Sequence, residues 1–110
     1  MPDRARTGRP AAIFAALGDE NRLRLLSRLS SGPVSISGLT EGAGITRQGV
    51  TKHLRVLAGA GLVRGTRRGK ESVWRLERRR LEEAKRSLDQ ISRQWDVALG
   101  KLKLYVEQEN

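Results

Sequence analysis

The segment Ile45–Gly65 constrains the fold more than any other part of this 110-residue chain. Within it, Val50, Leu54 and Leu57 recur at helical spacing and predict one apolar helix face. The opposite face is polar and basic and carries Arg47, Gln48, Thr51, Lys52 and Arg55. Thr46 is a good N-cap, and Gly61 is typical of a left-handed C-cap. We therefore predict a helix over about residues 46–60.

Two extended runs, LVRGTRR and ESVWRLE, follow this helix and are separated by the Gly69-Lys70 turn. Such a pattern predicts a β-hairpin over about residues 62–77, and three cations, Arg67, Arg68 and Lys70, lie at its tip. Ahead of the basic helix, the run VSIS indicates either a short strand or the start of another helix. A short helix, a tight turn, a basic helix and a hairpin make a winged helix-turn-helix, a mainly α fold with a small β-hairpin.

The N-terminal third predicts two earlier helices. Apolar residues from Arg9 to Leu17, including Ile13 and Phe14, have helical spacing, and residues 1–8 before them are expected to form a flexible tail. Asp19 is a good N-cap for a second helix that ends at the Ser-Ser-Gly-Pro break. We expect residues 9–110 to form a single domain.

The positive charge is concentrated in the middle of the chain. The net charge is +10, and residues 45–80 hold eleven basic and two acidic side chains, which is +9. A basic protein attracts nucleic acid or an acidic membrane surface. However, no apolar run approaches the ~20 residues of a spanning helix, and the N-terminus lacks the apolar part of a secretory signal. We therefore expect a cytoplasmic protein that binds nucleic acid and no membrane.

The C-terminal segment predicts a long helix over about residues 78–107. Its apolar residues alternate steps of three and four, which is the spacing of a helix-pairing seam. The seam consists of Leu81, Ala84, Leu88, Ile91, Trp95, Ala98, Leu102 and Tyr105. Because this segment is nearly neutral, we expect it to pair with another helix, away from the nucleic acid.

Catalytic and metal-binding patterns are missing from the sequence. The chain has no cysteine, and it has a single histidine, His53. It also has no glycine-rich phosphate loop and no convergent carboxylate pair, so we expect neither an enzyme nor a bound cofactor or metal. His53 is either a structural residue or a phosphate contact. Trp74 and Trp95 could stack on single-stranded nucleic acid, but their positions in a strand and in the seam favour packing.

The runs ALGDENRLRLLSRL and ITRQGVTKHLRVLAGAGLVRGTRRGKESVWRL resemble the ArsR family of dimeric winged-helix repressors. The resemblance implies a homodimer, joined by its first and last helices, that binds a palindromic DNA operator with two recognition helices. Base edges would be read by Arg47, Gln48, Thr51 and Lys52. Phosphates would be held by Thr46, His53, Arg55, Arg67, Arg68 and Lys70. The dimer interface would contain Ile13, Phe14, Leu81, Leu88, Ile91, Trp95 and Leu102.

The sequence departs from the metal-sensing members of that family. Those members carry a cysteine pair before the recognition helix, where this chain reads SGLTEGAG, or Asp and His on the last helices, where Asp89 has no histidine near it. We therefore expect a regulator that does not respond to metal, whose signal is a small molecule, a protein or its own expression level. The alternative function is a nonspecific architectural or RNA-binding winged-helix protein, which would bind operator and random duplex equally.

Overall fold

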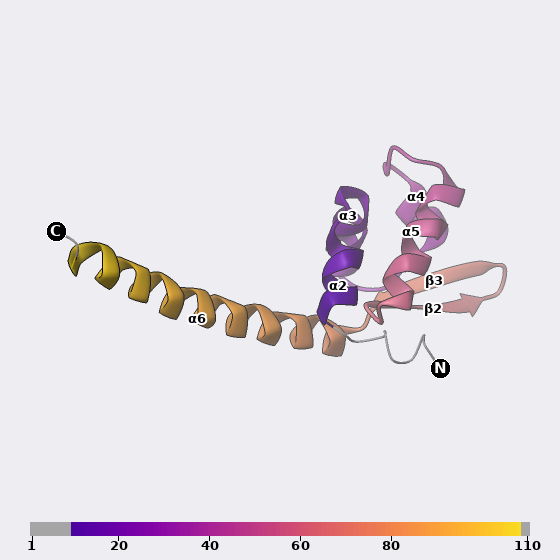
Figure 1. The fold of residues 1–110 in the computed structure, drawn as a ribbon. Coiled ribbons are helices and arrows are strands. Elements are labelled where there is room, and N and C mark those ends of the chain that lie inside the picture. Colours follow the sequence, from indigo (N-terminus) through magenta and orange to yellow (C-terminus); the bar gives the residue numbers. More distant parts are fainter. Residues whose placement is uncertain (1–9, 109–110) are drawn as a thin grey trace.

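The computed structural model describes residues 10–108, so the expected tail at residues 1–8 lies outside the described residues. The elements in chain order are α2 (Pro10–Leu17), α3 (Glu20–Leu29), β1 (Val34–Ser35), α4 (Ile36–Thr40), α5 (Arg47–Gly59), β2 (Val63–Arg68), β3 (Glu71–Leu76) and α6 (Arg78–Gln108). Helices α2 to α5 gather beside the β2–β3 hairpin, and α6 extends away from them (Figure 1). The prediction of a mainly helical fold with a small β-hairpin is confirmed.

The sheet has one strand more than the predicted hairpin. Its order is β1-β3-β2, and all neighbours are antiparallel. The run VSIS is divided between two elements, because Val34 and Ser35 pair with β3 while α4 begins at Ile36. Gly69 turns the hairpin with a φ of +61°, a conformation that favours glycine. The third strand fixes the base of the hairpin to the helical part of the molecule.

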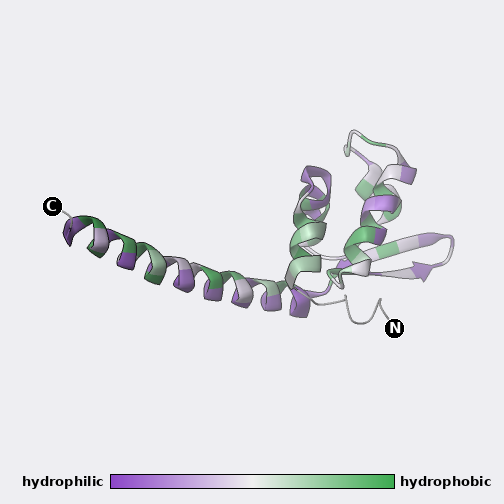
Figure 2. Ribbon diagram, in the orientation of Figure 1, coloured by the Kyte–Doolittle hydropathy of each residue, from purple (hydrophilic) through white to green (hydrophobic). Residues whose placement is uncertain are grey.

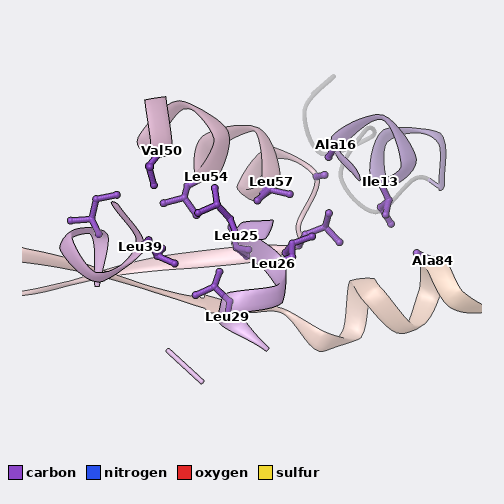
Figure 3. Packing of buried hydrophobic residues seen from close by; sticks show 14 residues of the cluster. Ile13, Ala16, Leu25, Leu26, Leu29, Leu39, Val50, Leu54, Leu57 and Ala84 are labelled. Carbon is purple, nitrogen blue, oxygen red and sulfur yellow. The ribbon is translucent and has the colours of Figure 1, made fainter. Parts of the chain in front are cut away.

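The core lies between the helices and the base of the sheet (Figure 3). Val50, Leu54 and Leu57 of α5 are completely buried there, so the apolar face predicted for this helix faces the core. Ile13 is also completely buried within the single chain. Its place in a dimer interface stays a prediction, and within the single chain Ile13 has no exposed surface to offer a partner. Helical spacing identified its apolar face but could not tell which surface would cover it.

Helix α6 is 31 residues long and makes the molecule elongated, with extents of 69 × 34 × 22 Å. Ala84 is its one buried residue, and it faces the core near α2. Beyond Ala84, apolar and polar residues alternate around a helix that projects from the remaining fold (Figure 2). None of the helices in residues 10–108 is long and apolar enough to cross a membrane.

Candidate nucleic-acid interface

The first three turns of α5 expose a polar face. Arg47, Gln48, Lys52 and Arg55 are exposed, and Thr51 between them is half-buried. Together with Val56, these five residues line one open surface hollow. The structure thus brings the four residues predicted to read bases onto one surface with Arg55. Because Val50, Leu54 and Leu57 anchor the opposite side of α5, this surface is held in a fixed orientation.

Two hydroxyl groups at the start of α5 already have partners within the helix. Thr46 is the N-cap, and its Oγ1 accepts a hydrogen bond of 3.0 Å from the backbone N–H of Gly49. Thr51 donates its hydroxyl proton to the carbonyl oxygen of Arg47 at 2.9 Å. The Thr46 hydroxyl therefore stabilises the helix end whether or not it meets a phosphate, and Thr51 has no spare hydroxyl proton for a base in this rotamer.

The β2–β3 hairpin forms a basic wing beside α5 (Figure 1). Arg67, Arg68 and Lys70 are exposed at or next to its turn. Arg67 donates from Nε to the carbonyl oxygen of Gly69 at 3.3 Å. Farther down the wing, the ring of Trp74 lies over Gly65, where an added Cβ would meet it at 3.0 Å. Trp74 packs against the core, as the strand position predicted, rather than standing out as a stacking platform.

His53 turns away from the basic face of α5. Its Nδ1 lies 3.4 Å from Arg22 Nη1 and 4.0 Å from Asp19 Oδ1, both at the start of α3. Its side chain is only 20% exposed. The geometry favours the structural role of this residue, and its assignment as a phosphate contact stays a prediction that these contacts do not support. The sequence could not distinguish the two roles, because position 53 borders both faces of the helix.

Sequence reasoning missed one residue of this surface, Glu71, the first residue of β3. Its Oε1 accepts a hydrogen bond from the backbone N–H of Ser37 at 3.0 Å and another from the Ser37 hydroxyl. The same oxygen lies 3.5 Å from Nη2 of Arg47. These hydrogen bonds, the Ser37 hydroxyl first, lower the pKa of the Glu71 carboxyl, and Arg47 lowers it further. The available signal was that residues 45–80 contain only two acids, Glu71 and Glu77.

The predicted dimer residues divide into two groups. Phe14 and Leu81 are half-buried and pack against the core of the single chain. The seam residues farther along α6 are exposed, and they include Leu88, Ile91, Trp95 and Leu102. Trp95, for example, is 63% exposed. This second group has apolar surface available for a partner.

A buried helix-turn-helix core, an exposed polar face on its second helix and a basic wing beside that face define a winged helix-turn-helix DNA-binding protein. A family model described as a helix-turn-helix domain matches residues 17–66. An uncharacterised HTH-type transcriptional regulator, YuzN of Bacillus subtilis, is 42% identical over 73 residues, which cover 60% of this chain and 79% of the relative. The regulator NmtR of Mycobacterium tuberculosis is 38% identical over 66 residues, which cover 60% of this chain but only 55% of the relative.

A solved structure extends the similarity to most of the chain. The ArsR-like transcriptional regulator from Rhodococcus sp. RHA1 is 35% identical, with a TM-score of 0.73, over 86% of this chain and 89% of the other. The protein described here belongs to the ArsR family of winged helix-turn-helix transcriptional regulators. The relatives are transcriptional regulators.

Proposed function

We propose that this protein is a sequence-specific repressor that binds a palindromic operator as a homodimer in the cytoplasm. The observation that carries the proposal is the exposed face of α5, where Arg47, Gln48 and Lys52 stand over a buried anchor of three apolar residues. Amide and guanidinium groups of this kind pair with base edges in the major groove. The exposed cations of the wing would hold the neighbouring phosphates and set the register.

A second copy of the chain is the expected partner of α6. Its exposed seam keeps steps of three and four from Leu88 to Tyr105, a spacing that two such helices can bury against each other. Two-fold pairing presents one α5 on each side, which matches a palindromic site. A single recognition helix would leave half of the operator unread.

The proposed regulator does not respond to metal. In support, no three His, Cys, Asp or Glu side chains within residues 10–108 are grouped so that they could hold a metal ion. The chain contains no cysteine, and His53 supplies at most one imidazole. Micromolar zinc, cadmium, arsenite or copper should leave DNA affinity unchanged in a titration followed by fluorescence anisotropy. Tight stoichiometric metal binding that releases DNA would contradict this expectation.

The competing function is a nonspecific architectural protein, which would use the same basic surface. The two functions differ in how binding depends on sequence at one salt concentration. In a competition experiment, a duplex selected by the protein from a randomised pool should bind at least about 10³-fold more tightly than random duplex. Equal competition by the two duplexes would favour the architectural function. An RNA duplex included as a third competitor separates the RNA-binding alternative.

A further inference from the structure

Glu71 connects three elements, β3, α4 and α5. It lies on β3 of the wing, its partner Ser37 lies in α4, and its partner Arg47 is the first residue of α5. All three contacts converge on one atom, Glu71 Oε1. The two donors of Ser37 fix the position of that oxygen, so the carboxylate is a fixed point against which the Arg47 guanidinium can be oriented.

DNA affinity does not account for a carboxylate at this place, and the hydrogen bonds from Ser37 account for the link between β3 and α4 but not for the contact with Arg47. A negative charge beside a surface that attracts phosphates weakens the attraction. The ion pair is also exposed, with 58% of the Arg47 side chain and 36% of the Glu71 side chain accessible, and such pairs contribute little to stability. The contact does, however, orient the guanidinium group of Arg47. One edge of the Arg47 fork is drawn toward the wing, and its other donors remain for a partner in the groove.

We infer that Glu71 is a specificity-determining residue that positions Arg47 to read one base pair, so that wing and recognition helix act as one reading unit. The inference rests on the proposed function, in which Arg47 contacts a base edge. Without the carboxylate, the long side chain of Arg47 is free to turn toward the nearest phosphate. It then holds DNA of any sequence and discriminates less between bases.

The test compares Glu71→Gln with Glu77→Gln. Glu77 lies at the other end of the wing, where its Oε1 is 3.6 Å from Nε of Arg64 on β2, so its substitution makes the same charge change beside an arginine that does not belong to α5. Affinities are measured at one salt concentration for a duplex that the wild type selects from a randomised pool and for its single-base-pair variants. Arg47→Ala first identifies the base pair that Arg47 reads. Thermal unfolding of each variant checks that the fold is kept.

At that base pair, Glu71→Gln should lower discrimination about tenfold, within the range of one bidentate contact. Glu77→Gln should leave it within about twofold, the scatter of a surface charge change. In the Arg47→Ala background, Glu71→Gln should cause no further loss, because a residue that acts through Arg47 has nothing left to position.

Three outcomes would overturn the inference. If Arg47→Ala loses discrimination at its base pair while Glu71→Gln keeps the wild-type value, the proposed function stays intact but Glu71 has no role in it. An equal loss from Glu71→Gln with and without Arg47 would mean that the carboxylate acts by another route. A wild type that binds all duplexes equally would overturn both this inference and the proposed function.

Discussion

Three short polar side chains cap the N-termini of α3, α4 and α5. Asp19, Ser35 and Thr46 each accept a hydrogen bond from a backbone N–H in the first turn of α3, α4 and α5, respectively. These bonds satisfy donors that the helix itself leaves unpaired. The caps at Asp19 and Thr46 could be predicted from sequence, because each precedes an apolar helical pattern. Ser35 could not, because the run around it was compatible with two elements.

The cap at Asp19 makes stability depend on pH. Hydrogen bonds from the backbone N–H groups of Arg22 and Asn21, with the Arg22 charge, lower the pKa of this carboxyl below its ordinary value. A lowered pKa in the folded state means that the stabilisation is present above the ordinary range and is lost as the pH falls through the folded value. Asp19→Asn keeps a capping oxygen but does not titrate. Its urea midpoint should therefore fall less than that of the wild type between about pH 5 and about pH 2. If the midpoints of the two proteins fall equally with pH, Asp19 does not cause the pH dependence of stability.

Side-chain contacts between elements far apart in the chain could not be predicted from the sequence. Arg47 and Glu71 are 24 positions apart, and their contact depends on where the wing packs against α4 and α5. The same holds for His53, whose partners Asp19 and Arg22 lie on another helix. Periodicity assigns a residue to a face of its own element, and only the packing of elements decides what that face meets.

At the level of elements, the wing is expected to position the protein on DNA without reading its sequence. Arg67→Ala and Arg68→Ala should weaken binding to selected and random duplex by similar factors, and each should lower the salt slope by ~1. Arg75→Ala is the matched control, because Arg75 is an exposed cation of β3 near the opposite end of the wing. A changed base preference with an unchanged salt slope would mean that the wing reads bases.

Helix α6 supplies the second prediction at this level. Leu88→Glu or Ile91→Glu should give a monomer with weakened operator binding, because an unpaired charge buried in the seam costs several kcal/mol. Val97 is an apolar residue of α6 with 58% exposure, close to the 53% of Leu88, but it lies outside the seam, so Val97→Glu should remain dimeric. Light scattering measures the mass of each variant. Dimers of the seam variants, or dissociation of all three, would contradict the proposed interface.

The elements with strong periodicity could be predicted, and the weaker ones could not. Helix α5 runs from Arg47 to Gly59 where a helix was predicted over about residues 46–60. Its C-cap is Ala60, and Gly61 directly after it adopts the positive φ expected at the end of the helix. Strand β1 has two residues, too few for an alternating pattern. For α2 the apolar face was visible, but Ile13 packs inside the chain, because periodicity does not distinguish an internal contact from a contact with a partner.

The whole molecule separates charge from apolar surface. The basic residues of positions 45–80 lie on α5, the wing and the start of α6, whereas residues 81–110 carry a net charge of −1. The exposed apolar residues are concentrated on the projecting part of α6 (Figure 2). This division fits a molecule whose one end meets DNA while its other end meets a second copy. It follows from the order of segments along the chain, and so it could be predicted from sequence.

The central claim is that the exposed face of α5 reads bases. Its most direct test is a binding-site selection run in parallel on the wild type, Gln48→Ala and Lys52→Ala at one salt concentration. We expect the wild type to select a palindrome, and each variant to lose preference at its own pair of symmetric positions, since one bidentate contact gives ~1–3 kcal/mol of discrimination. Random-duplex affinity should change little for Gln48→Ala, which removes no charge. Identical selected sequences for all three proteins would contradict the claim.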